Sequence, residues 1–382
     1  MQIYTFALMK CIKILLILFI LNSCDDQSNK RIDKPAKSIN VYRFDQELFS
    51  IDSLNIDIKL SEWGDLTHDF IDYYYRDVLE IEGFNYDKTK EQILFGLHNQ
   101  DLFQQNKIIG SSIEKEFKDF NNLVRSLEDV FRRIHALFPE LVVPSAIVTV
   151  NGENGYGMTF KSDTIVLCLD RYLGHEFYND NPQMYPPSIV PRYLTKTWDK
   201  RYITRDIVEN WIDVHFNMYN KKDKFLDYLI YKGKIIYLML ECMPDYDLSN
   251  IFKFSKTEYD DCEFNESIVW NEIIKQNYLY SSDFPSSFFH FSNETEGIPE
   301  SPSRLGYFIG YKIIDAFMTN NDITIRDLFF NMDSQRIYLQ SRYQPNKNQQ
   351  IFEEVSIFRQ YWWLIFIFVF VLSASYLFYL KK

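Results

Sequence analysis

Histidine is scarce in this chain, and no two histidines have the spacing of a zinc-binding helix. The six histidines are His68, His98, His135, His175, His215 and His290, so none has a second histidine four residues further on. The closest approach to the H-E-x-x-H zinc motif is His175-Glu176-Phe177-Tyr178-Asn179, in which a poor zinc ligand ends the motif. Gly174, directly before it, disfavours a helix there. The sequence therefore predicts no metal site and no cofactor.

The chain also lacks the common glycine-rich and serine-centred motifs. Gly-x-Ser-x-Gly, Gly-x-Gly-x-x-Gly and the phosphate loop are all absent, which removes the strongest sequence signals for a serine hydrolase or a nucleotide site. No catalytic residue is predicted. Glycine and proline number 12 each while aromatic residues make up 17% of the chain, a composition typical of a globular core and not of a disordered protein.

Positive charge is in short supply. Residues 1–23 and 361–382 carry four charged residues, all lysine. The stretch between them therefore keeps 37 of the 41 basic residues and all 53 acidic ones, a net charge of −16. A surface of this sign repels nucleic acid and anionic lipid headgroups. The sequence therefore predicts no nucleic-acid partner.

Cysteine is too infrequent to form a disulfide scaffold, which a chain of this size does not need. Of the five cysteines, Cys11 lies in the predicted export signal and Cys24 follows it. Cys168 lies in an apolar run and is expected to be a small buried hydrophobe. Cys242 and Cys262 remain, and their spacing leaves open whether they form a bridge.

The N-terminus has the order of a bacterial lipoprotein signal. A short basic region precedes an apolar run over residues 14–21, which is too short to cross a bilayer, and Leu21-Asn22-Ser23-Cys24 follows. A cysteine directly after a small residue predicts cleavage before Cys24 and acyl chains on its thiol as a membrane anchor. The alternative is an ordinary secretory signal with a chance cysteine. Translation begins at Met1 or at Met9.

The C-terminus has the features of a transmembrane helix. Residues 362–380 carry no charge, and at ~1.5 Å per residue they span the ~30 Å hydrocarbon core. Lys381 and Lys382 follow, so the positive-inside rule places this end in the cytoplasm. A buried core helix is the alternative. The predicted organisation is a signal peptide (1–23), a polar tether (24–39), a single globular exported domain (40–345), a linker (346–360) and a transmembrane helix (361–380).

Apolar periodicity predicts a predominantly helical α+β domain. Helical spacing recurs over Ile113–Leu137, Asp199–Met218, Phe225–Leu240, Glu266–Tyr278 and Leu305–Met318. Between the first two, the apolar stretches 141–150 and 164–169 flank two Asn-Gly turns. This pattern predicts a small β-hairpin.

A few polar, aromatic and glycine residues are candidates for function. Asp170 and Tyr172 directly follow a predicted buried strand, where a polar loop often lines a cleft, although a plain strand-exit turn explains them equally well. Burial of Trp270 explains Glu266 and Trp270 at least as well as function does. The candidate cleft residues are Asp170, Tyr172, Glu266, Trp270 and Arg304. Gly306 and Gly310 have the spacing that lets two helices approach closely, with a ligand contact as the alternative.

Several short motifs follow one another in a recognisable order. They are Arg43-Phe44-Asp45-Gln46-Glu47-Leu48-Phe49, Leu169-Asp170-Arg171-Tyr172-Leu173-Gly174, Tyr231-Lys232-Gly233-Lys234, Asn265-Glu266-x-x-x-Trp270, Pro299-Glu300-Ser301-Pro302 and Ser341-Arg342-Tyr343-Gln344-Pro345. With these motifs the chain resembles the gliding-motility lipoprotein GldB family. The resemblance implies an envelope lipoprotein needed for gliding and tied to the type IX secretion and motility machinery. It also implies a fold like that of a zinc peptidase that has lost its metal ligands.

The chain departs from the family pattern in two places. The terminal membrane helix is an addition, and the tract 185–224 looks less like the family than its flanks, which puts a cleft there in question.

The first functional hypothesis is a non-catalytic component of the gliding apparatus that acts through protein contacts. A hydrolase of peptides or cell-wall material, with Asp170, Glu266 and Arg304 as polar groups, and a glycan-binding module are the alternatives. The two anchors predict the inner membrane with the domain in the periplasm; the outer membrane is the alternative.

Overall fold

The computed structural model describes residues 38–64, 86–151, 157–216, 223–330 and 333–346. The predicted signal peptide, the lipid site at Cys24 and the predicted transmembrane helix over residues 361–380 lie outside these ranges. Within them, no helix combines the length and the apolar character that a membrane span requires.

A four-stranded sheet has the order β1-β2-β4-β3. Its strands are β1 (Asn40–Tyr42), β2 (Ala146–Val150), β3 (Met158–Lys161) and β4 (Thr164–Cys168). β1 pairs with β2 and β2 pairs with β4 in parallel, whereas β3 is antiparallel to β4. β2 and β4 are β-branched and almost wholly buried, as expected of strands in the middle of a sheet.

The predicted hairpin is therefore wrong in its pairing. The two strands that the sequence places in a hairpin, β2 and β4, are parallel neighbours, with Ala146 opposite Thr164. The hairpin partner of β4 is β3, which lies in the segment where the sequence predicted only turns. Ser162, between β3 and β4, has a φ of 51°, so the turn there is a tight one with a residue in the left-handed region.

Among the described residues, five helices follow β1 before the chain returns to the sheet. They are α2 (Phe44–Phe49), α3 (Ile56–Gly64), α5 (Tyr86–His98), α6 (Gln100–Glu116) and α7 (Asn121–Leu137). The single helix predicted over 113–137 is wrong, because α6 ends at Glu116 and α7 begins at Asn121. At the break, the side chain of Asp119 accepts a hydrogen bond from the backbone N–H of Asn121 at 2.8 Å. A local bond of this kind competes with helical hydrogen bonding.

The remaining chain is mainly helical, which confirms the predominantly helical α+β class. Its helices are α8 (His175–Asp180), α9 (Arg192–Thr195), α10 (Ile203–Phe216), α11 (Phe225–Cys242), α12 (Leu248–Phe252), α13 (Lys256–Phe264), α14 (Glu266–Lys275), α15 (Leu305–Asn320), α16 (Ile325–Phe330) and α17 (Ser334–Ser341). The expectation that Gly174 prevents a helix at His175 is wrong. Gly174, at φ +91°, is the residue from which α8 starts.

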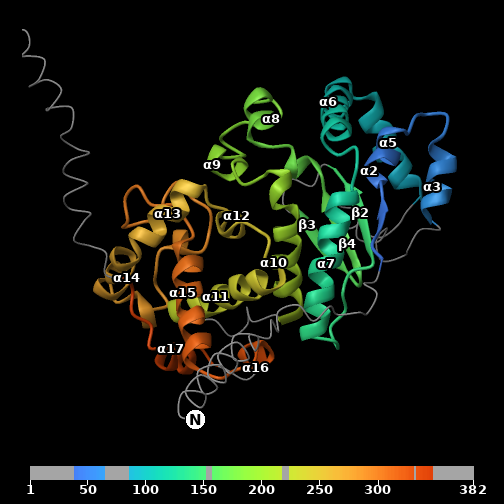
Figure 1. Ribbon diagram of the computed structural model, residues 1–382. Coiled ribbons are helices and arrows are strands. Elements are labelled where there is room, and N and C mark those ends of the chain that lie inside the picture. Colours follow the sequence, from blue (N-terminus) through green and yellow to red (C-terminus); the bar gives the residue numbers. More distant parts are fainter. Residues whose placement is uncertain (1–37, 65–85, 152–156, 217–222, 331–332, 347–382) are drawn as a thin grey trace, which may run out of the picture. The chain divides into compact units, whose positions relative to one another are not determined.

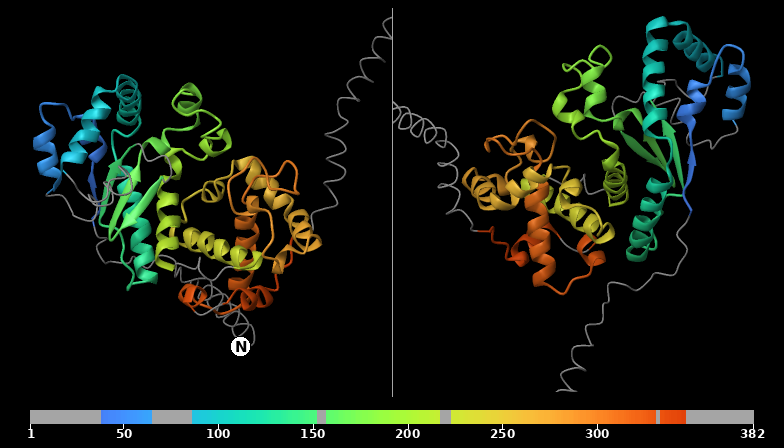
Figure 2. Two further views of the ribbon diagram at one scale, coloured as in Figure 1. Left: turned by 180° about the vertical axis from the view of Figure 1, so that it is seen from behind. Right: turned by 45° about the horizontal axis from the view of Figure 1, so that its top comes forward.

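Helix α10 separates the sheet from the helices that follow it. It contacts β3 on one side and α11 on the other, and Figure 1 shows it between the strands and the group formed by α11 to α15. Both views in Figure 2 keep the green strands and the orange helices on opposite sides of it. α11 and α15 pack against each other over most of their length.

The described cysteines are all buried thiols. They are Cys168, Cys242 and Cys262, so the bridge between Cys242 and Cys262 that the sequence left open does not form. Burial raises the pKa of the Cys242 thiol to about 12. A buried thiol of this kind is a packing group with little reactivity.

Candidate functional site

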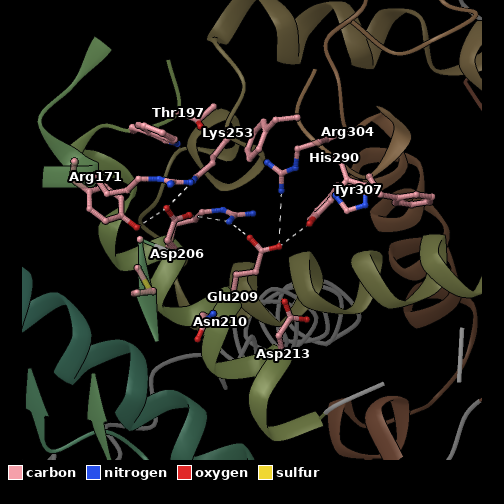
Figure 3. Close-up of a pocket in the computed structure, with 17 residues that line it drawn as sticks. Arg171, Thr197, Asp206, Glu209, Asn210, Asp213, Lys253, His290, Arg304 and Tyr307 are labelled. Atoms are coloured by element: carbon pink, nitrogen blue, oxygen red, sulfur yellow. Dashed lines mark hydrogen bonds and ion pairs between the residues drawn. The ribbon is translucent and has the colours of Figure 1, made fainter. Parts of the chain in front are cut away.

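A polar cavity of about 340 Å³ lies beside α10. Its other walls come from segments next to β3 and β4 and from the segments after α12 and before α15. Its lining residues are Gly157, Met158, Arg171, Tyr172, Thr197, Trp198, Arg205, Asp206, Glu209, Asn210, Asp213, Lys253, Phe289, His290, Phe291, Arg304 and Tyr307. Figure 3 shows their side chains converging from several elements. We take this cavity as the candidate site and call it the α10 cavity.

Helix α10 supplies the carboxylates of the α10 cavity. Asp206, Glu209 and Asp213 recur at steps of three and four residues, so they share one face of the helix. The other face is apolar and buried, and it includes Trp211, whose ring N–H donates to the backbone oxygen of Val142 at 2.9 Å. The amphipathic pattern of α10 therefore turns the carboxylates toward the cavity.

Glu209 is the acceptor at the centre of a buried ion cluster. It forms an ion pair with Arg205, lies 3.6 Å from the Lys232 ammonium and 4.0 Å from the Arg304 guanidinium. The hydroxyl of Tyr307 donates to it at 2.9 Å. Burial by itself would raise the pKa of Glu209, but the surrounding cations outweigh it and hold this pKa well below its usual range.

Asp206 organises a second cluster on the sheet side of the cavity. The Lys253 ammonium lies 2.7 Å away, and the Tyr172 hydroxyl donates to it at 3.0 Å. Arg205 bridges this cluster to the first with an ion pair to Asp206 at 3.1 Å. Burial lowers the pKa of Lys253 to about 8, against the opposing attraction of Asp206.

Aromatic rings hold two further guanidinium groups in the cavity wall. Arg171 lies over the ring of Trp198 at 3.7 Å. Arg304 lies between Tyr307 at 3.9 Å and Phe291 at 4.4 Å. Stacking of this kind fixes the plane of a guanidinium while leaving its N–H groups available for hydrogen bonds.

The structure brings only some of the predicted cleft residues together. Tyr172 and Arg304 both line the α10 cavity. Asp170 is buried beside it, with its carboxylate accepting from the Cys168 thiol at 2.8 Å and its backbone oxygen accepting from Tyr178.

Glu266 and Trp270 lie elsewhere, on α14. Glu266 accepts a hydrogen bond from the Tyr343 hydroxyl at 2.7 Å, and the Trp270 ring packs edge-on against the Tyr343 ring at 5.1 Å. Burial raises the pKa of Glu266. This pair joins α14 to the segment after α17 and takes no part in the α10 cavity.

Gly306 and Gly310 lie in α15 and face different neighbours. A Cβ on Gly310 would overlap the backbone oxygen of Leu229 in α11. A Cβ on Gly306 would instead overlap the ring of Phe289 and the backbone oxygen of Phe288.

Sequence reasoning missed the residues that contribute most to the site. The tract 185–224, in which the sequence put a cleft in question, contains α10 with Arg205, Asp206 and Glu209. A usable signal was present, because three carboxylates recur at helical spacing along one face of α10. Within the described ranges, no group of three or more His, Cys, Asp or Glu side chains is placed to hold a metal ion.

Comparison with known proteins assigns the chain to a family. The family model of the gliding motility protein GldB matches residues 25–345, which is most of the chain and includes the whole lining of the α10 cavity. Comparison with curated proteins and with solved structures gives no match. The match confirms the resemblance read from the motifs: the chain belongs to the gliding motility protein GldB family.

Proposed function

We propose that this protein is a non-catalytic envelope component of the gliding machinery, acting with motility and type IX secretion proteins through binding. Membership in the GldB family supports the link to gliding. The state of Glu209 supports a role without catalysis. Its carboxylate lies among four cations that depress its pKa, so it is a poor proton acceptor at neutral pH. A general base needs a pKa near the working pH.

A hydrolase of zinc-peptidase-like ancestry is the second candidate, and one observation favours it. Glu209 and Asp213 lie one helical turn apart on the cavity side of α10, the spacing that two histidines have in a zinc-binding helix. The polar groups suggested for a hydrolase from the sequence do not support it, because Arg304 lines the cavity whereas Glu266 lies on α14. A glycan-binding module would present exposed aromatics in a groove, but here the cavity rings of Trp198 and Tyr307 stack on guanidinium groups.

The first experiment tests binding against hydrolysis. A photo-crosslinking residue at the exposed positions Ile189 and Leu339, 75% and 63% accessible, should capture motility and secretion envelope proteins in living cells. The controls are the chain without the crosslinker and an unrelated lipoprotein. Equal capture by the controls would contradict the binding role. Release of fragments from cell-wall sacculi or unfolded protein by the purified chain, abolished by Glu209→Gln, would favour the hydrolase.

The second experiment tests how the chain is anchored. We propose acyl chains on Cys24 and a transmembrane helix over 361–380, which together place the domain in the periplasm at the inner membrane. Cys24→Ser should abolish labelling with a palmitate analogue, while a cytoplasm-dependent reporter fused after Lys382 should be active in an inner-membrane fraction. Cys168→Ser is the matched control, because Cys168 is buried. Unchanged labelling, or recovery in the outer membrane with a silent reporter, would overturn the double anchor.

A further inference from the structure

We propose that the α10 cavity binds a small ligand that carries an oxyanion, a carboxylate or a phosphate, together with a hydrogen-bond donor. The inference goes beyond the proposed function and does not depend on it. Four features of the described residues carry it: the excess of positive charge, two buried polar atoms without partners, a stacked guanidinium without a carboxylate, and strained backbone at two cations.

Positive charge exceeds negative charge at the cavity, although the chain as a whole has a net charge of −12. Among the described residues, the cations that line it are Arg171, Arg205, Lys253 and Arg304, and the anions that line it are Asp206, Glu209 and Asp213. The excess is one positive charge. Buried cations without a matching anion are costly, so an arriving anion lowers the energy of the site.

Two buried polar atoms in the wall lack a hydrogen-bond partner in the described part of the chain. Arg205 is 2% exposed; its Nε donates to the backbone oxygen of Ile251 at 2.8 Å and its Nη1 contacts the α10 carboxylates, whereas its Nη2 has no acceptor. Asn210 Oδ1 is likewise buried without a donor. Both residues line the cavity. An oxyanion satisfies the first atom and a ligand N–H or O–H satisfies the second.

Arg171 adds a cation whose described neighbours include no carboxylate. Its guanidinium lies on the Trp198 ring at 3.7 Å, and no carboxylate oxygen of the described residues lies within the 4.0 Å of an ion pair. A guanidinium presents its donors in a planar fork that matches carboxylate and phosphate oxygens. Figure 3 shows Arg171 and Lys253 on the same side of the cavity, above Asp206.

The backbone is strained where it presents two of these cations. Lys253 has a φ of 57° and Arg304 a φ of 69°, in the left-handed region that side chains other than glycine rarely adopt. Strained residues of this kind persist where the surrounding structure enforces them, and they cluster at ligand sites. From this conformation, Lys253 at the C-terminal end of α12 and Arg304 directly before α15 each place a cation in the cavity wall.

The affinity for an anion should depend on pH through Lys253. The groups facing its ammonium are Asp206 and Arg205 on α10, Arg304 before α15 and the Tyr202 ring. With a pKa of about 8, Lys253 is charged at pH 7 and loses its charge as the pH rises. Anion affinity should therefore fall as the pH rises through about 8.

Calorimetric titration of the full-length chain in detergent micelles tests the proposal with three probes. They are inorganic phosphate, N-acetylglycine and N-acetylglycinamide, the last having the shape of the second without its charge. At least one of the two anions should bind at a single site. The affinity of N-acetylglycinamide should be at least about tenfold lower than that of the better anion. The better of the two anions identifies the source of the oxyanion as phosphate or carboxylate.

Charge variants locate the binding site. Arg171→Gln should weaken the preferred anion by about tenfold to a hundredfold, because it removes a donor without stranding a carboxylate. Asp213→Asn should strengthen binding, because it removes a negative charge from the wall. Lys200→Gln is the matched control: Lys200 pairs with Glu116 at 2.8 Å on the surface, and affinity should not change. Melting temperatures show that each variant is folded.

Three outcomes would overturn the proposal. One is that neither anion binds up to ~10 mM, which is weaker than ordinary small-ligand affinity. Another is that N-acetylglycinamide binds as well as N-acetylglycine while phosphate does not bind. The third is that Arg171→Gln and Lys200→Gln have the same effect. None of these bears on the capture of envelope proteins, so this proposal and the proposed function can fail separately.

Discussion

Gly310→Ala should destabilise the protein by about 3 kcal/mol or more, beyond the usual cost of one added methyl group in a packed core. The added Cβ would overlap the backbone oxygen of Leu229 and lie 3.0 Å from the backbone nitrogen of Gly233. Both neighbours belong to the α11 backbone, so no side chain can rotate away. The two helices would have to separate, and α11 is buried along almost its whole length.

The size of the effect matters because helix propensity acts in the opposite direction. Alanine is favoured over glycine within a helix by about 1 kcal/mol, so a stabilised variant would show that the two helices are not in backbone contact. Denaturant unfolding of the full chain gives the measurement. Asp315→Ala on the same helix is the matched control, since Asp315 is exposed and its replacement should change stability by no more than about 0.5 kcal/mol. Equal stabilities for the two variants would contradict the predicted contact.

Local periodicity explains why some of the fold is predictable from the sequence. The helices α10, α11 and α15 were expected, because each keeps an apolar face over several turns. The break between α6 and α7 was not expected, because apolar spacing continues through Phe117 and Phe120. At the break, the Asp119 side chain bonds to the backbone of Asn121, and a polar bond of this kind does not change the spacing of the apolar residues.

Strand pairing shows a different limit. The apolar stretches β2 and β4 were both expected, but the two Asn-Gly turns between them favoured a hairpin. Their nearly unbroken apolar character is instead typical of parallel strands that are buried on both faces. β1 has three residues and pairs with β2 from a distant part of the chain. A strand this short carries little periodic signal. The parallel arrangement depends on contacts between segments far apart in sequence.

The α10 cavity could be predicted only in part for the same reason. Tyr172 was singled out because it directly follows a predicted strand, and Arg304 as a candidate polar group for a hydrolase. Glu209, which neighbours Arg304, was not predicted as a site residue. Its hydrogen-bond donor Tyr307 lies 98 residues away in the sequence. Charge partners at such separations leave no local pattern. Glu266 was grouped with the cleft residues although burial of Trp270 explained it equally well, and the fold places it against Tyr343, outside the α10 cavity.

Glu209→Ala is the second substitution expected to have a large effect. It removes the carboxylate that Arg205, Lys232 and Arg304 share, and the side chains of these three cations are 2%, 6% and 3% exposed. Removing one partner of a buried ion pair typically destabilises a protein by about 3–5 kcal/mol, because the remaining charge stays buried without compensation. Glu209→Gln should cost less, because the amide oxygen keeps the hydrogen bond from Tyr307.

The pH dependence of this loss separates a charge effect from a packing effect. The pKa of Glu209 lies well below its usual value of 4.5 in the folded protein, so its contribution to stability is present above about pH 4.5 and is lost as the pH falls through the lowered value. The difference between wild type and Glu209→Ala should therefore be largest at neutral pH and shrink in acid. Glu116→Ala, which breaks the exposed pair with Lys200, should cost less than about 1 kcal/mol at any pH. A loss at Glu209 that is the same at pH 7 and in acid would mean that side-chain volume, and not the buried cluster of cations, determines the effect.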